Sequence, residues 1–270
     1  MVSSLDHAIQ GNTLTSPYHK SDDEQNLRMF DYIVSNPPFK LDFPEDHKQL
    51  KNMTSRFWAG VPNVPKEINP QKPKMAIYTL FLQHVINSLK NDGKAAIVVP
   101  TGFLTAHSGI ENKILKHIVE ERIVFGAISM PSNVFASTGT NVSVLFLDNS
   151  RQSENVILVD ASKLGEDYKD GNITKHRLNE TEINKIIETF QKRETIEDFS
   201  VIVPYDKIKE KNCSLAAGQY FDIKIEYVDI TAEEFKAKMD GFKANLNEYF
   251  KQSKELEEEI NKQLGNLKYE

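Results

Sequence analysis

Cysteine is nearly absent from this chain of 270 residues, in which Cys213 is the single example. One thiol cannot form an internal disulfide framework, a cysteine-rich zinc site or a redox pair. Long apolar runs are missing as well, since no stretch reaches the roughly 18 residues of a membrane span. The amino terminus also lacks the apolar core of a signal peptide. We therefore expect a cytoplasmic protein without membrane association.

An excess of positive charge is absent too, because the formal net charge is -6. A free-standing DNA-binding domain is usually basic, at least locally. If nucleic acid is a partner, its phosphates should meet a local patch of this chain or another subunit. No cluster of His, Asp and Glu has metal-ligand spacing, so we expect no metal site. We expect His84 and His107 to be structural or solvated.

Closely spaced glycines are the third absence. The chain has 12 glycines, and no two of them are separated by a single residue, so there is no G-x-G sequence. In Rossmann-like folds the cofactor lies over such a glycine-rich loop, and an acidic residue further on holds the ribose. The usual signal for one half of a cofactor site is therefore missing.

Strand-like and helix-like segments alternate along the first half of the chain. Apolar runs predict strands at 32–35, 95–100, 123–131 and 141–148, and helical spacing predicts amphipathic helices at 76–94 and 108–121. We expect Gly93 to close the first helix as its C′ residue. Residues 40–74 are expected to form a long loop rich in Pro and Lys. This order indicates an α/β fold with a mostly parallel sheet and a final antiparallel hairpin.

The pattern changes beyond residue 150. Residues 154–162 predict one more strand, and residues 179–193 predict a helix capped by Asn179 or Thr181. From residue 231 the chain reads as one helix to its end, with Gly241 as a candidate bend. Residues of that helix at spacings of three and four form a seam, namely Leu246, Tyr249, Ser253, Leu256, Ile260, Leu264 and Leu267.

The stretch FDYIVSNPPFK, residues 30–40, ends a strand in an unusual way. The carboxyl ends of parallel strands form the ligand edge of an open α/β sheet. There Asn36 and the Pro37 carbonyl offer two acceptors held by tandem prolines, and Phe39 offers a flat apolar face. Such a clamp suits a planar group bearing NH2, whose nitrogen becomes more nucleophilic when rigid acceptors bind both hydrogens. An ordinary strand-ending turn is the plainer alternative.

Several motifs together resemble the adenine-N6 DNA methyltransferases, and specifically the modification subunits of type I restriction–modification systems. These motifs are GNTL (11–14), FDYIVSNPPF (30–39), LKNDGKAAIVVPTGFL (89–104), SMPSNVFASTGTNVSVLFL (129–147), SLAAGQYFDIKIEYVD (214–229) and LEEEINKQLGNLKY (256–269). The resemblance covers nearly the whole chain. It implies a partial Rossmann-like class I S-adenosylmethionine-dependent methyltransferase fold with a helical C-terminal region.

The resemblance also implies roles for individual residues. Asn36, Pro37, Pro38 and Phe39 match the catalytic motif, so Asn36 and Pro37 would hold the target amine and Phe39 would stack on the flipped base. Phe135 matches the position that supports the other face of that base, although ordinary core packing is an equal alternative. Asn12 stands where the family usually has an Asp that touches the adenine ring of S-adenosylmethionine. Asn36 is expected to contribute to that cofactor site as well.

Only ten residues precede GNTL, too few for the first two strands and helices of such a fold. We therefore expect residues 1–150 to be the C-terminal half of a methyltransferase domain, on the target-base side. Residues 151–230 would be a mixed α/β extension, and residues 231–270 a helix that docks on a specificity subunit. The S-adenosylmethionine site would be incomplete in this chain.

The function implied is site-specific adenine-N6 methylation of DNA as part of a type I modification subunit. The implied partners are double-stranded DNA, the specificity and restriction subunits, and a complementing N-terminal half or a second modification subunit. Two alternatives stay open. One is a catalytically silent scaffold, and the other is a methyltransferase for another planar amine, such as protein glutamine or RNA guanine.

Overall fold

The protein is described by a computed structural model that covers residues 9–20, 27–134, 141–171, 173–222 and 230–265. The chain forms two compact units, Met1–Phe221 and Asp222–Glu270, which are treated separately below. Among the described residues, no helix combines the length and the apolar character needed to cross a lipid bilayer.

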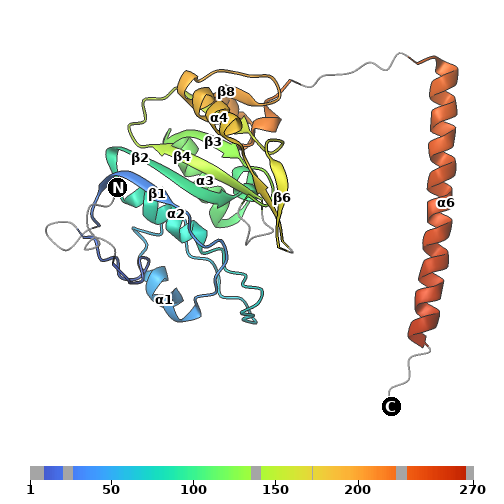
Figure 1. The fold of residues 1–270 in the computed structure, drawn as a ribbon. Helices are drawn as coiled ribbons and strands as arrows, with labels where there is room; N and C mark the ends of the chain where they lie inside the picture. Colours follow the sequence, from blue (N-terminus) through green and yellow to red (C-terminus); the bar gives the residue numbers. More distant parts are fainter. Residues whose placement is uncertain (1–8, 21–26, 135–140, 172, 223–229, 266–270) are drawn as a thin grey trace. The chain divides into compact units, whose positions relative to one another are not determined.

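The first unit is built on a six-stranded sheet with the order β1-β2-β4-β3-β5-β8 (Figure 1). Its strands are β1 (Phe30–Ser35), β2 (Leu89–Pro100), β3 (Val124–Ser129), β4 (Val142–Asp148), β5 (Asn155–Asp160) and β8 (Ser200–Pro204). The pairs β1–β2 and β3–β5 are parallel, whereas β4 and β8 run antiparallel to their neighbours. Four strands therefore share one direction, and the predicted mostly parallel sheet with an antiparallel β3–β4 hairpin is confirmed.

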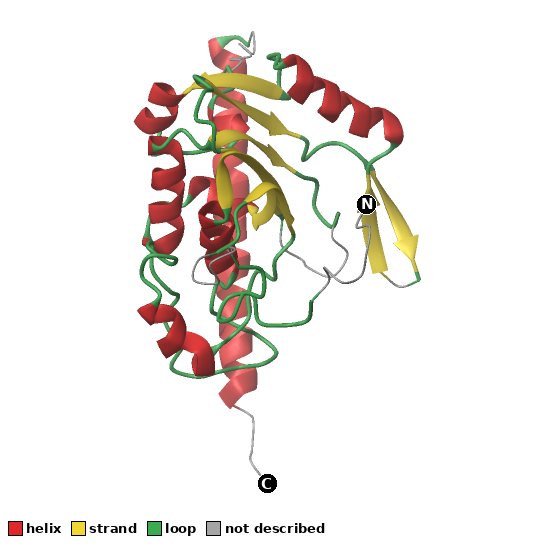
Figure 2. Cartoon of the chain, turned by 90° about the vertical axis from the view of Figure 1, so that its left-hand side faces the viewer, coloured by secondary structure: helices red, strands yellow, loops and turns green. Residues whose placement is uncertain are grey.

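Helices cover the two faces of this sheet unequally (Figure 2). The helices α2 (Tyr78–Asn87) and α3 (Gly109–Glu120) pack on the face that carries the buried residues Ala95, Ile97 and Val99 of β2. The helix α4 (Glu180–Lys192) covers the other face over β3, β4 and β5. On that face, Tyr32 and Val34 of β1 remain 77% and 86% exposed. The end of the sheet at β1 thus presents uncovered apolar side chains.

Two sequence predictions between β1 and β2 were wrong. The helix that was expected to run to Gly93 ends at Asn87, because the next residues are drawn into β2 by pairing with β1. Gly93 lies in that strand, where a Cβ atom would come within 2.8 Å of the Phe30 carbonyl oxygen. The expected loop at 40–74 contains a short helix, α1 (Pro44–Asn52), which begins with proline and buries Leu50.

The rest of the first unit extends the sheet and adds a hairpin. The remaining elements are η2 (Thr101–Thr105), β6 (Glu166–Asp170), β7 (Ile173–Arg177), α5 (Tyr205–Glu210) and η3 (Ala217–Gln219). The capping box at the start of α4 is confirmed, since Asn179 and Glu182 bind each other's backbone N–H groups at 2.9 Å. The domain boundary predicted at residue 150 stays a prediction. The strands β5 and β8, which follow residue 150, lie in the same sheet as the strands that precede it.

The second unit consists of one long helix, α6 (Ala232–Gly265). The helix was predicted from residue 231, and its start is fixed by reciprocal hydrogen bonds between Thr231 and Glu234. The helix continues through Gly241, so that glycine does not break it. None of its residues is buried within the chain, and Leu246, Leu256 and Ile260 are all more than half exposed. Leu267, at the end of the predicted seam, lies outside the described residues.

Candidate active site

The turn Asn36–Phe39 follows directly from the carboxyl end of β1. Pairing of Val34 with Ala96 and of Ser35 with Ile97 holds that end against β2. Pro37 is buried, whereas Asn36 is exposed. The Asn36 side chain makes no hydrogen bond to another residue within the described part of the chain, so its amide is free to bind a ligand. The proline anchors the backbone while the amide faces outward.

The Phe39 ring is positioned by a chain of aromatic contacts. It meets the Tyr78 ring edge-on with centroids 6.3 Å apart, and Tyr78 meets Phe103 in the same way at 6.2 Å. The Tyr78 hydroxyl donates a hydrogen bond to Glu111 Oε1 at 3.0 Å, which ties α2 to α3. Burial, with the nearby Glu111 carboxylate, raises the pKa of Tyr78 well above its usual range, so this hydroxyl keeps its proton. Edge-to-face contacts of this kind fix ring orientation.

The chain that leaves the turn is tied down by Asp42. Its Oδ1 atom accepts hydrogen bonds from the backbone N–H groups of Lys74 and Met75, both at 2.9 Å. The Leu41 N–H donates to the Met75 carbonyl at 3.1 Å. Residues on either side of the long connection are therefore held together beside the turn. Neither Asp42 nor Tyr78 was identified from the sequence, because their roles depend on contacts between segments about 30 residues apart.

The GNTL segment forms a compact turn around Asn12. The Asn12 Oδ1 atom accepts hydrogen bonds from the N–H groups of Leu14 and Thr15 at 3.1 and 3.2 Å. Its Nδ2 atom donates to Asp46 Oδ2 at 3.0 Å. The side chain is thus engaged by its own turn and by α1. Within the described residues, no hydrogen bond joins Asn12 to the Asn36–Phe39 turn.

A buried arginine fixes this segment to α2. Arg56 donates to the carbonyl oxygens of Thr13 and Leu14 at 2.7 and 2.6 Å and to His84 Nδ1 at 2.8 Å. A guanidinium cannot accept, so His84 Nδ1 is the acceptor. Burial and the adjacent Arg56 charge lower the pKa of His84 to about 4, and burial lowers the pKa of Arg56 to about 10. Near neutral pH the histidine is neutral and the arginine charged, which fits the structural role expected for His84.

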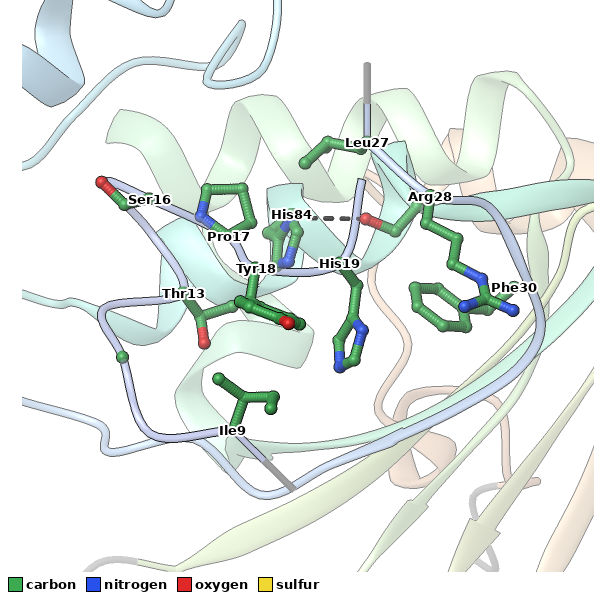
Figure 3. Close-up of a pocket in the computed structure, with 12 residues that line it drawn as sticks. Ile9, Thr13, Ser16, Pro17, Tyr18, His19, Leu27, Arg28, Phe30 and His84 are labelled. Atoms are coloured by element: carbon green, nitrogen blue, oxygen red, sulfur yellow. Dashed lines mark hydrogen bonds between the residues drawn. The ribbon is translucent and has the colours of Figure 1, made fainter. Parts of the chain in front are cut away.

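Two hollows lie beside the GNTL segment. The first is a cavity of about 90 Å³, lined by Gly11, Thr13, Phe30 and His84 and by the rings of Tyr18 and His19 (Figure 3). A shallower groove of about 490 Å³ is lined by Thr15, Met29, Arg56 and other residues. Neither hollow includes a residue of the Asn36–Phe39 turn, and the first borders Phe30, at the opposite end of β1. Pockets for ligands of cofactor size span roughly 300–1,000 Å³.

The described residues therefore do not complete an S-adenosylmethionine site. The cavity of about 90 Å³ at GNTL is too small, and the groove of about 490 Å³ has no residue of the Asn36–Phe39 turn in its lining. The Asn12 amide is already bonded, and the chain has no G-x-G loop. The second aromatic residue expected at the target base, Phe135, lies outside the described residues. The turn formed by Asn36, Pro37, Pro38 and Phe39 remains the candidate site.

Comparisons with known proteins identify the family to which the chain belongs. Residues 3–227 match the model of the N-6 DNA Methylase family. The methylase subunit of the type I restriction enzyme MpnII from Mycoplasma pneumoniae is 30% identical over 74% of this chain and 35% of its own length. The methylase subunit of the type I restriction enzyme MjaIX from Methanocaldococcus jannaschii is 28% identical over 93% of this chain and 44% of its own length.

A solved structure shows the same fold. The type I restriction–modification methyltransferase subunit from Streptococcus thermophilus superposes with a TM-score of 0.62 at 26% identity, over 78% of this chain and 41% of that one. The chain thus spans less than half the length of each of these three proteins. The fold is a partial class I S-adenosylmethionine-dependent methyltransferase fold with a helical C-terminal region. The chain belongs to the N-6 DNA methylase family.

Proposed function

We propose that this chain is the target-base half of an adenine-N6 DNA methyltransferase, as part of a type I modification subunit. The observation that carries the proposal is the Asn36–Phe39 turn, which presents a free amide beside a ring fixed by Tyr78. The likeness to type I methylase subunits favours DNA adenine over the amines of protein glutamine or RNA guanine.

The chemistry of the turn follows from its geometry. The exocyclic nitrogen of adenine is a weak nucleophile because its lone pair is delocalised into the ring. Acceptors from Asn36 and the Pro37 carbonyl would bind both N–H groups and favour the pyramidal nitrogen that reacts. Phe39 would stack on the base after it has left the duplex. The methyl donor, S-adenosylmethionine, would be held mainly by residues outside this chain.

A complementing polypeptide is supported by the uncovered end of the sheet. β1 is the terminal strand of the sheet, with β2 as its hydrogen-bonded neighbour. Its exposed side chains Tyr32 and Val34 leave an apolar strip on the face that α4 does not reach. Unpaired strand edges and apolar patches of this kind are typical of surfaces that bind another segment. We propose that a segment carrying the glycine-rich loop adds a strand at β1 and helices over this face.

The helix α6 supports a second contact, with the specificity subunit. Its apolar residues recur at spacings of three and four along 34 residues, and all of them are exposed within the chain. Such a stripe needs a partner helix to be buried. Docking on the coiled-coil helices of a specificity subunit would supply one, and the restriction subunit would join that assembly.

The test of the proposed function is methyl transfer in a reconstituted mixture. The chain is combined with the missing N-terminal half, a specificity subunit, duplex DNA and labelled S-adenosylmethionine. Label should enter adenine with the wild-type chain and fall by at least about 100-fold with Asn36→Ala, because the turn loses a transition-state acceptor. Gln152→Ala, at an exposed position in another loop, should leave the rate unchanged.

The scaffold alternative predicts a different result in the same mixture. The specificity subunit would still bind through α6, but no label would enter DNA, or label would enter equally with the wild-type chain and Asn36→Ala. Either result would remove the catalytic proposal and leave the role of α6 intact.

A further inference from the structure

The long connection after the turn carries a positive charge that the whole chain does not. Residues 40–74 contain seven Lys and Arg against four Asp and Glu, although the chain as a whole has a net charge of -6. All six lysines of this stretch are exposed, and four of them lie outside the helix α1, namely Lys40, Lys66, Lys72 and Lys74. We call these four residues the lysine cluster.

The lysine cluster is attached to the candidate active site. Lys40 directly follows Phe39 of the turn. Lys74 is fixed to the same place, because its N–H donates to Asp42 Oδ1 at 2.9 Å. The Asp42 Oδ1 atom accepts this backbone contact, Oδ2 is buried without a hydrogen-bond partner, and among the described residues no lysine side chain pairs with this carboxylate. The positive charges thus begin at the two chain segments that border the turn.

The segment from Lys66 to Lys74 is stiff for a connection without regular structure. Pro65, Pro70 and Pro73 restrict its backbone. A hydrogen bond from the Lys72 N–H to the Asn69 carbonyl at 3.1 Å closes a turn within it. The charges are therefore presented on a backbone that loses little freedom when it binds a ligand.

The four ammonium groups have no partner within the described chain. Some exposed cations on other elements pair with acids, as in Lys90–Asp31 at 2.8 Å, Lys94–Asp148 at 3.3 Å and Arg177–Glu166 at 2.8 Å, whereas others, such as Lys116 and Lys163, have no ion pair with a described residue. No ion pair or side-chain hydrogen bond joins any member of the lysine cluster to another residue that the structure describes. A row of unpaired, exposed cations suits a polyanion.

We propose that the lysine cluster binds the phosphates of the DNA strand that carries the target base. Lysine is a point charge well suited to phosphate oxygens, and phosphate contacts fix the register of a protein on its duplex. A base held by the Asn36–Phe39 turn keeps its own phosphates within reach of the segments beside that turn. The inference rests on the proposed function, because it names the nucleic-acid contact of the same site.

The test uses the full chain and a fluorescein-labelled 30-base-pair duplex, with binding measured by anisotropy between about 50 and 200 mM salt. The variant changes all four residues of the cluster to Gln. We expect it to weaken binding by about tenfold or more at the lowest salt and to reduce the slope of log K against log salt by about 2–4, near 0.9 per lost phosphate contact. The control changes Lys116, Lys163, Lys207 and Lys209, which are exposed on other elements, to Gln. It should leave the affinity and the slope close to those of the wild-type chain.

Three results would overturn the proposal: no binding of the duplex at 50 mM salt, equal slopes for the cluster variant and the wild type, or an equal loss in the control. Binding of polyglutamate in place of the duplex would assign the cluster to an acidic protein and would also overturn it.

Asn36→Ala should keep the wild-type slope. A reduced slope for the cluster variant, without methyl transfer by the reconstituted wild type, would refute the proposed function alone. Methyl transfer by the wild type, with equal slopes for the cluster variant and the wild type, would refute the lysine cluster alone.

Discussion

At the scale of single residues, the site consists of a few exposed groups held by buried neighbours. Asn36 is free, whereas Phe39 depends on Tyr78 and Phe103 for its orientation. The sequence predicts a site role for Asn36, Pro37, Pro38 and Phe39 because they are adjacent and chemically distinctive, and that role stays a prediction. Tyr78, Asp42 and Arg56 could not be identified in that way, since their partners lie far along the chain.

The Tyr78 hydroxyl provides a first test at this scale. Tyr78→Phe keeps the ring next to Phe39 and removes the hydrogen bond to Glu111. Since one such bond contributes about 1 kcal/mol, we expect the free energy of unfolding to fall by about that amount in urea denaturation. Tyr249→Phe is the matched control, because that side chain is 64% exposed on α6 and should give no change. Equal stability of Tyr78→Phe and wild type would contradict the role given to this bond.

The pair Arg56–His84 predicts a pH dependence. The folded-state pKa of His84 is lowered to about 4, below the ordinary 6.5, so the unfolded chain takes up a proton first as pH falls. The stability that His84 contributes is present above pH 6.5 and is lost between pH 6.5 and about 4. The full contribution of His84 to the free energy of unfolding is on the order of 3 kcal/mol.

The measurement is the free energy of unfolding at several pH values for wild type and His84→Gln, which keeps an acceptor for Arg56 and does not titrate. We expect the wild type to lose more stability than the variant between pH 6.5 and 4. His107→Gln, at an exposed loop position, should follow the wild type. Parallel curves for wild type and His84→Gln would show that this histidine is not the titrating group.

At the scale of elements, predictions from sequence succeeded where a local pattern decides the outcome. Continuous apolar runs marked β2, β3 and β4, and the capping box marked the start of α4. Predictions from sequence failed where pairing between distant segments decides the bounds of an element. The polar residues that precede Gly93 favour a helix end locally, yet pairing with β1 places them in β2. The helix α1 was missed because charged residues with few apolar positions do not show a clear helical period.

The close approach of β3 to β5 gives a test at this scale. A Cβ atom at Gly126 would lie 2.6 Å from the Ile157 carbonyl oxygen and 3.0 Å from Phe190 Cε1. Because backbone of β5 must move to make room, Gly126→Ala should lower the free energy of unfolding by about 1–3 kcal/mol. Gly218→Ala has no atom within 4 Å of the added carbon and should be close to neutral. A neutral Gly126→Ala would mean that the two strands can separate at little cost.

At the scale of the whole molecule, the chain presents a candidate target-base turn and two apolar surfaces that no described residue covers. One is the end of the sheet at β1, and the other is α6. The missing glycine loop predicts an incomplete cofactor site, and this stays a prediction. The sequence could not predict which face of the sheet would be left open, since that depends on where α4 packs.

A charge introduced on the uncovered face of β1 should weaken association with the complementing half without changing the stability of the isolated chain. Val34→Glu should leave the stability of the isolated chain within about 0.5 kcal/mol, because this side chain is 86% exposed. The same change should weaken association with the complementing half by at least about tenfold in sedimentation analysis, since it places a charge in the contact. Lys163→Glu, an exposed change of charge elsewhere, should not weaken it. Normal association of Val34→Glu would place the contact on another surface.

The most direct test of the central claim is calorimetric titration of S-adenosylmethionine into the chain alone and into the chain mixed with its complementing N-terminal half. The complementing half is titrated alone as a reference. We predict no binding to the isolated chain, because the described residues do not complete the cofactor site, and stoichiometric binding to the mixture. Stoichiometric binding by the isolated chain with micromolar affinity would contradict the account.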